Sequence, residues 1–227
     1  MIDKKAICRA VNLKKTYWRG KVAVDALQGV SIEILPNDYV SIMGPSGSGK
    51  STLVHILSGL DSPTSGEYYL ENKLVSNYTD QELAKVRNEF FGFVFQSFSL
   101  LSRLTALDNV AMPLIYAGVK KQERKIKAQT ILKRVGLGDR MLHRPNEMSG
   151  GECQRVAIAR SLVNNPKVIF ADEPTGNLDS KTGTEIMELF DSLVSEGNTV
   201  VMVTHDINVA NHASRIIKLK DGLIEND

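Results

Sequence analysis

A glycine-rich run in the first quarter of the chain has the residue types that bind a phosphate chain. It matches G-x-x-x-x-G-K-[ST] and reads Gly44, Pro45, Ser46, Gly47, Ser48, Gly49, Lys50 and Ser51, with Thr52 next. Glycines let backbone N–H groups curl around phosphate oxygens, and a helix beginning there adds a favourable dipole. Lys50 would place its charge at the β- and γ-phosphates, and Ser51 offers a hydroxyl to Mg²⁺. The run predicts a nucleoside triphosphate site. A plain Gly/Ser turn is the weaker alternative, because a strand-like run precedes it and a helix-like run follows.

Two carboxylates and a histidine follow two later apolar runs. Asp172 and Glu173 come directly after residues 168–171, and His205 follows residues 199–203. Ligands of parallel sheets lie beyond the carboxyl ends of the strands, so these side chains should face the phosphate loop. Asp172 suits Mg²⁺ coordination, and Glu173 suits activating a water for attack on the γ-phosphate. His205 would contact the γ-phosphate. Taken alone, the pair could be a solvated strand end and His205 a surface histidine.

The segments around these residues alternate between strand-like and helix-like patterns. Strands are predicted at residues 7–13, 30–34, 39–43 and 67–70, and buried parallel strands at 168–171 and 199–203. Helices are predicted at 51–60, 79–87, 155–163 and 183–194, with a helical pattern from 102 to 147 in which Gly136 ends one helix. This order predicts an α/β core that carries an inserted helical subdomain.

Composition narrows the classes of protein. The chain has 227 residues, a formal net charge of +2 and two cysteines, Cys8 and Cys153, without metal-ligand spacing. The charge is small for a nucleic-acid binder, and the cysteines favour a reducing compartment. Residues 1–9 lack the apolar segment of a signal peptide, and no run of about 18 apolar residues exists. We therefore expect a protein that would dock onto a membrane-spanning partner if it works at a membrane, and no nucleic-acid partner.

A short run before a predicted helix points to one family. Residues 148–152 read Met-Ser-Gly-Gly-Glu and stand shortly before the acidic strand. The run resembles the signature motif of ATP-binding cassette (ABC) ATPases, usually written L-S-G-G-Q/E, with Met148 in place of the common leucine. The resemblance extends over essentially the whole chain. It implies ATP and Mg²⁺ as ligands and ATP hydrolysis as the activity.

The resemblance also implies roles for individual residues. Gln96 matches the glutamine that contacts Mg²⁺ and water at the hinge to the helical subdomain, and Asp179 lies in the segment matching the D-loop. His205 matches the switch histidine. Tyr17 stands where the family keeps an aromatic ring that stacks on adenine, and the adjacent Trp18 is the alternative. The implied catalytic set is Glu173, His205, Gln96 and Lys50, and the implied metal set is Ser51, Gln96 and Asp172.

The fold that the resemblance implies is an α/β P-loop core of the ABC ATPase type, with an N-terminal antiparallel β portion. Residues 1–96 and 165–227 would form the core, and about 97–164 the helical signature subdomain. A second copy would close the ATP site with its Ser149, Gly150 and Gly151, giving an ATP-bound homodimer. A helix start fits that role, because its free N–H groups attract an anion.

Finer resemblance lies in residues 61–66, 103–110 and 171–179. These segments resemble the branch that contains lipoprotein-release and macrolide- or peptide-efflux ATPases and a cell-division ATPase. The branch implies a peripheral subunit on the cytoplasmic face of the inner membrane, serving a separately encoded permease. The segments do not separate export from cell division.

Two further classes of protein explain less of the sequence. A soluble ABC ATPase acting on DNA or ribosomes usually has two cassettes or a coiled-coil insertion. A GTPase or small-molecule kinase leaves residues 149–151 unexplained. The basic run from Lys120 to Lys127 is interpreted as a solvated helix face, with anionic lipid headgroups as the alternative. Residues 111–117 suit either core packing or a groove for the permease.

Overall fold

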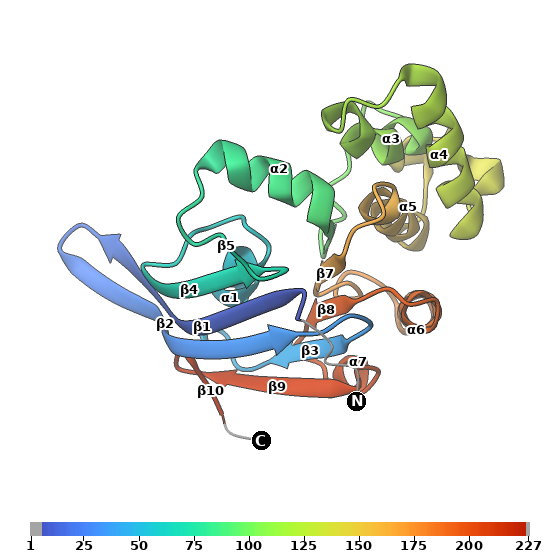
Figure 1. Cartoon of the computed structure of the whole chain (residues 1–227). Helices are drawn as coiled ribbons and strands as arrows, with labels where there is room; N and C mark the ends of the chain where they lie inside the picture. Colours follow the sequence, from blue (N-terminus) through green and yellow to red (C-terminus); the bar gives the residue numbers. More distant parts are fainter. Residues whose placement is uncertain (1–5, 226–227) are drawn as a thin grey trace, which may run out of the picture.

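The N-terminal part of the chain forms an antiparallel sheet. The computed structural model describes residues 6–225 (Figure 1). The sheet has the order β2-β1-β4-β5, and its strands are β1 (Cys8–Arg19), β2 (Val22–Ile34), β4 (Ser65–Leu70) and β5 (Lys73–Leu74). The β1–β2 hairpin is longer than the strands predicted at 7–13 and 30–34. Its outer half is mostly exposed and therefore lacks the apolar alternation from which a strand is predicted.

The second sheet carries the predicted buried strands. It has the order β10-β9-β3-β8-β7-β6, parallel except for the β9–β10 pair. Its strands are β3 (Tyr39–Met43), β6 (Phe91–Phe95), β7 (Val168–Asp172), β8 (Val200–Val203), β9 (Arg215–Lys220) and β10 (Leu223–Ile224). Strands β3, β7 and β8 confirm the prediction at those positions. Strand β9, which pairs with β3, was not predicted.

Three of the helices, α3, α4 and α5, lie in the region of the chain between β6 and β7, and the others connect strands of the two sheets. The helices are α1 (Lys50–Leu57), α2 (Asp80–Phe90), α3 (Ala106–Tyr116), α4 (Lys121–Arg134), α5 (Gly150–Leu162), α6 (Ser180–Ser195) and α7 (Ile207–Ala210), with 3₁₀ turns at Gly138–Arg140 and Pro145–Glu147. In Figure 1, α3, α4 and α5 stand together beside the core sheet. No helix within residues 6–225 is long and apolar enough to cross a membrane.

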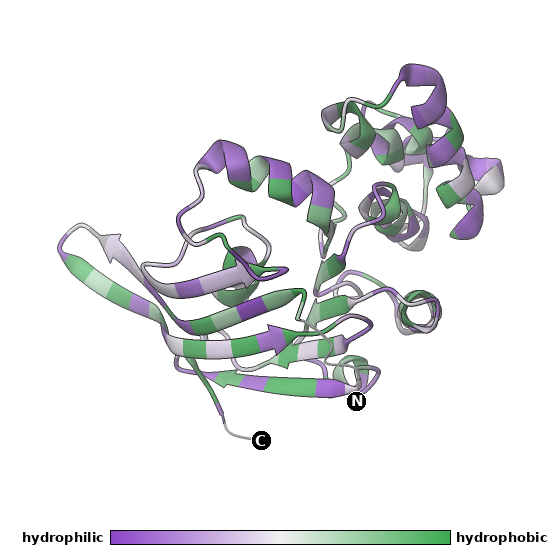
Figure 2. Ribbon diagram, in the orientation of Figure 1, coloured by the Kyte–Doolittle hydropathy of each residue, from purple (hydrophilic) through white to green (hydrophobic). Residues whose placement is uncertain are grey.

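The parallel strands are buried on both faces, as their continuous apolar runs predict. Alternate residues of β7 face opposite sides: Val168 and Phe170 pack toward α1 and the antiparallel sheet, whereas Ile169 and Ala171 pack toward α5 and α6. In Figure 2 these strands are mainly hydrophobic, and α2 and α4 present hydrophilic outer surfaces. Helix α1 is enclosed between the two sheets, which fixes the phosphate loop at its N-terminus.

One helix begins earlier than predicted. The sequence predicted a helix over 155–163, but α5 begins at Gly150. Ser149 is its N-cap: the Ser149 hydroxyl accepts from the Glu152 amide, and the Glu152 carboxylate accepts from the Ser149 amide at 2.8 Å. This capping box offsets the low helix propensity of two glycines. Gly150 and Gly151 thus lie in the first turn of a helix rather than in the loop before it.

Candidate functional site

The phosphate loop connects β3 to α1. Three of its glycines have positive φ angles: 156° at Gly44, 81° at Gly47 and 101° at Gly49. A Cβ at Gly44 or Gly49 would collide with the carbonyl oxygens of Leu219 or Ala26, but a Cβ at Gly47 would point into open space. Gly44 and Gly49 therefore allow the loop to fold tightly against its neighbours, and Gly47 leaves space open beside the loop. A loop that binds a phosphate chain through its backbone needs both properties.

The phosphate loop and the first turn of α1 carry polar side chains that can contact a phosphate chain or its cation. The Lys50 ammonium donates to the carbonyls of Gly44 at 2.7 Å and Pro45 at 2.8 Å, so it lies across the loop. The buried Ser48 hydroxyl has no hydrogen-bond partner among residues 6–225. Ser51 is exposed on the first turn of α1, and Thr52 follows it half-buried. These donors fit an anionic phosphate chain, and the Ser51 hydroxyl fits a hard cation bound to it.

The acidic strand end meets the predicted histidine. The Glu173 carboxylate lies 2.7 Å from Nδ1 of His205 and also accepts from the His205 amide at 3.1 Å. Its other oxygen accepts from the Thr204 hydroxyl at 3.2 Å. Glu173 has a φ of 46°, an uncommon conformation for glutamate. The ends of β7 and β8 thus hold the carboxylate in one orientation.

The charge of His205 depends on this contact. The hydrogen bond with Glu173, and then its negative charge, raise the pKa of His205 above the ordinary value near 6.5. A raised folded-state pKa means that the pair stabilises the fold fully below the unfolded pKa. That contribution is lost as the pH rises through the raised value. We expect ¹⁵N NMR titration to find His205 above the ordinary value in wild type and lower in Glu173→Gln. Unchanged titration in the variant would show that the two side chains are not paired in solution.

Asp172 lies beside Glu173, at the end of β7. Burial, and then the charge of Glu173, raise the pKa of Asp172, while His55 and Lys50 lower it in part. Lys50 and His55 therefore offset the charge of the two adjacent carboxylates only in part. A cation at this strand end would supply the remaining positive charge, which fits the predicted role of Asp172 near Mg²⁺.

The structure brings Gln96 against the segment that follows the acidic pair. Asn177 donates to the Gln96 carbonyl at 2.9 Å, and the Gln96 amide lies 3.5 Å from the Asn177 side-chain oxygen. A Cβ on Gly176 would come within 2.6 Å of the Gln96 amide nitrogen. Because Gly176 has no side chain, the Gln96 side chain can pack against it at the end of β6. Sequence reasoning missed this contact because its partners are 80 residues apart.

Two consecutive strained residues follow Gln96. Phe98 and Ser99 have φ angles of 60° and 48°. The half-buried Arg160 of α5 donates to the Phe98 carbonyl at 3.0 Å and to the Ser99 carbonyl at 2.6 Å. One guanidinium thus ties this turn to the helix that begins at Ser149. Arg160 was not predicted as a site residue, and no motif singles it out from the other arginines of the chain.

Removing this guanidinium should measure its contribution. Arg160→Met keeps much of the side-chain length but leaves two carbonyls of a strained turn unpaired. We expect a loss of about 2–3 kcal/mol in unfolding free energy, by urea titration. Arg155→Met is the matched control, because its ion pair with Glu185 at 3.3 Å is partly exposed and its hydrogen bond to the Val135 carbonyl is long, at 3.4 Å, so that the two together should contribute under about 1 kcal/mol. Equal stability of the two variants would show that the Arg160 contacts do not hold the turn.

Ser149 and Asp179 each begin a helix. The Asp179 carboxylate accepts from the Thr182 amide at 3.0 Å and from its hydroxyl, which makes it the N-cap of α6. Gly151 packs so closely on Thr182 that a Cβ would collide with the threonine methyl group. The starts of α5 and α6 are therefore in direct contact. Ser149, Gly150 and Asp179 lie at this surface, at the exposed end of each helix.

The two candidate adenine contacts lie on opposite faces of β1, since adjacent strand residues alternate. The Tyr17 hydroxyl donates to Asp61, which follows the C-terminal end of α1, at 2.7 Å. Trp18, on the other face, is 69% exposed. Of the two rings, only Tyr17 is directed toward the phosphate-loop helix.

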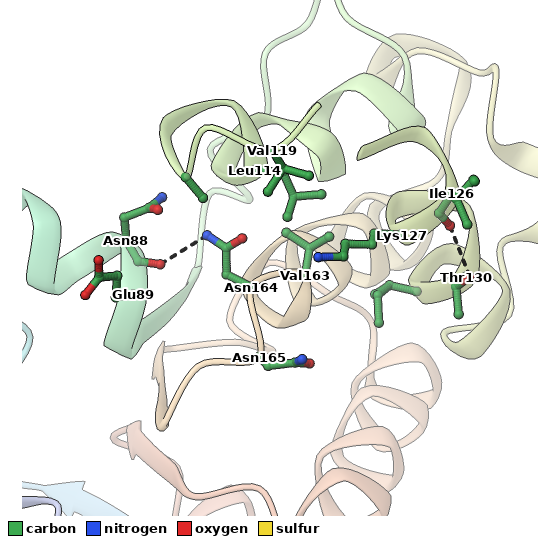
Figure 3. A pocket seen from close by; sticks show the side chains of 12 residues that line it. Asn88, Glu89, Leu114, Val119, Ile126, Lys127, Thr130, Val163, Asn164 and Asn165 are labelled. Atoms are coloured by element: carbon green, nitrogen blue, oxygen red, sulfur yellow. Dashed lines mark hydrogen bonds between the residues drawn. The ribbon is translucent and has the colours of Figure 1, made fainter. Parts of the chain in front are cut away.

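A cavity of about 430 Å³ lies away from the phosphate loop, between α2, α3, α4 and the end of α5 (Figure 3). Leu114, Val119 and Val163 supply apolar lining. On one side, the Asn164 amide donates to the Asn88 carbonyl at 3.1 Å, and the Asn88 amide donates to the Pro113 carbonyl at 3.0 Å. Within residues 111–117, Leu114 is buried, as core packing predicts, and Ala117 lines the cavity; a groove for the permease stays a prediction.

The basic run on α4 is largely solvated. Glu123 pairs with Lys127 at 2.9 Å, and Arg124 donates to the Val119 carbonyl at 2.9 Å. Lys121 and Lys125 are exposed on the helix surface. This fits the interpretation as a solvated face. Lipid contact stays an untested alternative.

A parallel sheet with this loop at the end of β3 and this carboxylate pair at the end of β7 defines a P-loop nucleoside triphosphatase. The sequence profile of the ABC transporter family matches residues 27–176, and the chain belongs to that family. It is an ATP-binding, ATP-hydrolysing domain of the ABC type, as the signature motif predicted.

Individual relatives agree with this assignment. The chain is 55% identical to an uncharacterized ABC transporter ATP-binding protein of Thermotoga maritima, over 97% of this chain and 94% of the relative. It is 54% identical to the macrolide export ATP-binding/permease protein MacB of Chlorobaculum tepidum, over 96% of this chain but 33% of MacB. The chain thus spans about a third of that larger protein.

Solved structures share the whole fold. The ATP-binding cassette MJ0796 of Methanocaldococcus jannaschii, in a dimeric post-hydrolysis state with ADP and Pi, superimposes with a TM-score of 0.88. The two chains are 49% identical, and the match covers 96% of this chain and 97% of MJ0796. The predicted fold class, an ABC ATPase core with an antiparallel β portion and a helical insertion, is confirmed.

Proposed function

We propose that this chain powers a separate membrane-spanning permease by ATP-driven dimerisation and hydrolysis. The observation that supports this most is the exposed start of α5, where Ser149 caps two glycines whose amides are free to bind an anion. A phosphate chain held by the loop of one copy would then be covered by the α5 start of a second copy. The dimeric MJ0796 cassette supports this arrangement.

Within each site, the residues have separate tasks. Backbone N–H groups of residues 44–49, apart from Pro45, and the Lys50 ammonium hold the β- and γ-phosphates, and Tyr17 contacts the adenine. Ser51, Asp172 and Gln96 are the residues that would hold Mg²⁺, which would supply positive charge against the phosphate oxygens during hydrolysis. Glu173 takes a proton from the attacking water, and His205, its partner before ATP binds, contacts the γ-phosphate.

The partner is proposed to be a permease that exports or extracts its cargo. Similarity to MacB, which is named for macrolide export, supports this direction over a role in cell division. A lipoprotein, peptide or macrolide-type molecule is the proposed cargo class. The chain would then work as a peripheral subunit on the cytoplasmic face of the inner membrane. The permease would choose the cargo.

The cavity between α2 and α4 is the proposed docking place of the permease. It is lined by apolar side chains, and exposed Ala117 stands at its edge. One wall of the cavity comes from α2, at the edge of the core, and the other walls come from α3, α4 and the end of α5 in the helical region. A partner segment bound there would therefore be displaced when these two regions move relative to each other.

The test is co-purification with an integral membrane protein from detergent-solubilised membranes of the source cells. We expect wild type to recover one and Ala117→Arg to lose it, because the arginine would fill the cavity. Ser195→Arg, on the exposed end of α6, adds the same charge elsewhere and should keep the partner. A partner retained by Ala117→Arg would move the docking place. Absence of any membrane partner for wild type would contradict the proposed function.

A further inference from the structure

Tyr17 is held in place by a carboxylate that lies far from it in the sequence. Its hydroxyl donates to Oδ2 of Asp61 at 2.7 Å. Asp61 follows the C-terminal end of α1, and its amide donates to the His55 carbonyl at 3.1 Å. Because α1 begins at the phosphate loop, one hydrogen bond connects the aromatic ring on β1 to the helix that carries the phosphate-binding residues.

A lysine completes the contact. The Lys15 ammonium donates to Oδ1 of Asp61 at 2.6 Å and to the Ser62 carbonyl at 2.7 Å. Only 13% of the Lys15 side chain and 29% of the Asp61 side chain are exposed. Burial alone would raise the pKa of Asp61, but hydrogen bonds from Lys15, Tyr17 and the Ser62 amide lower it overall. Asp61 is therefore a charged, well-anchored acceptor for the tyrosine.

The same lysine restricts the ring itself. Its ammonium lies 4.9 Å from the centroid of the Tyr17 ring, which is within cation–π range. The hydroxyl is thus fixed at one edge of the ring, and the ammonium covers one face. Tyr17 remains 38% exposed. The exposed part of the ring offers a flat apolar surface that a purine base can stack on.

We propose that Asp61 and Lys15 are positioning residues that hold the Tyr17 ring as a preformed platform for the adenine base of the nucleotide. The inference rests on the proposed adenine contact of Tyr17 and names the residues that make it rigid. A ring already ordered before binding loses less side-chain freedom when the base stacks on it, so affinity for the base is gained without a new contact. The triphosphate is bound by other residues and gains nothing from the platform.

The test compares a ligand with a base and one without. Calorimetric dissociation constants for ADP and for inorganic pyrophosphate are measured on wild type, Tyr17→Phe, Tyr17→Ala, Asp61→Ala and Lys15→Met. Tyr17→Phe keeps the ring and loses the hydroxyl that donates to Asp61. We expect this variant and Asp61→Ala each to weaken ADP affinity about 2- to 10-fold. Pyrophosphate affinity should not change. With ATP, KM should rise while kcat at saturation stays the same.

Two controls match the chemistry. Tyr69→Phe removes a tyrosine hydroxyl that donates to a different carboxylate, Glu67, at 2.8 Å, and should leave ADP affinity unchanged. Trp18→Ala removes the exposed ring on the other face of β1 and should also leave it unchanged. Loss of ADP affinity in either control would overturn the assignment of the platform to Tyr17 alone.

The outcomes separate the inference from the proposed function. If Tyr17→Ala weakens ADP but Tyr17→Phe and Asp61→Ala do not, the platform stands and the positioning role is overturned. If Tyr17→Ala has no effect on ADP, the adenine contact itself is wrong, and the inference falls with it. If Asp61→Ala weakens pyrophosphate as much as ADP, Asp61 acts on the phosphate loop and is not a positioning residue for the base.

Discussion

Glu173→Gln should lower ATP turnover by at least about 100-fold, because an amide cannot accept the proton of the attacking water. Glutamine has nearly the same shape, so contacts to Thr204 and the His205 amide can be retained. ATP affinity should therefore stay within about threefold of wild type, since general-base catalysis contributes to the transition state and not to ground-state binding. Phosphate release at saturating ATP and Mg²⁺ measures the turnover, and equilibrium titration measures the affinity.

The control is Glu188→Gln, an equally small change at an exposed residue of α6. It should hydrolyse ATP at the wild-type rate. Turnover by Glu173→Gln at the wild-type rate would contradict the role of Glu173. Loss of ATP binding in the same variant would instead mean that Glu173 acts in holding the nucleotide.

Ser149→Arg should abolish ATP-dependent dimers and leave ATP binding by each monomer nearly intact. The arginine would fill the space in which the α5 start of one copy meets the γ-phosphate of the other. Ser149→Asp tests the same surface by charge: aspartate caps a helix as well as serine, but its carboxylate would repel the γ-phosphate. Both variants are made in the Glu173→Gln background, and their masses with ATP are measured by light scattering.

A matched control separates dimer contact from helix capping. Thr79 caps α2 with the same capping box, through Glu82. Thr79→Arg should cost about 1 kcal/mol of stability, as Ser149→Arg should, yet keep the ATP-bound dimer. Loss of monomer ATP binding in Ser149→Arg would place the signature in the same chain's site. An unchanged dimer in both Ser149 variants would contradict the composite site.

Local signals carried much of the fold. The phosphate loop and the capping box at Thr79 depend on residues within eight positions of one another, so their spacing is visible in the sequence. Strands β3, β7 and β8 were predicted because burial on both faces makes them continuously apolar. Strand β9 mixes charged and apolar residues and was missed. The start of α5 was placed late because helix propensity disfavours Gly150 and Gly151, although the capping box of Ser149 and Glu152 that offsets this propensity is itself a local signal.

The contacts that complete the site could not be predicted from the sequence, for a different reason. Asp61 and Tyr17, Gln96 and Asn177, and Arg160 and the strained turn after Gln96 each join residues that are distant along the chain. Nothing in residue type marks Asp61 or Arg160, because a capping, surface or ion-pair role explains such residues equally well. Only the fold shows that Asp61 contacts Tyr17 and that Arg160 contacts the turn that follows Gln96.

The central claim is that ATP joins two copies of this chain, and the mass of Glu173→Gln in solution tests it most directly. Slow hydrolysis in this variant should let the ATP-bound state persist, so that ligand binding stabilises the dimer by mass action. Light scattering after gel filtration should give the monomer mass of 25.0 kDa without nucleotide and twice that mass with ATP. A monomer mass at saturating ATP, with ATP binding verified in the same sample, would contradict the account.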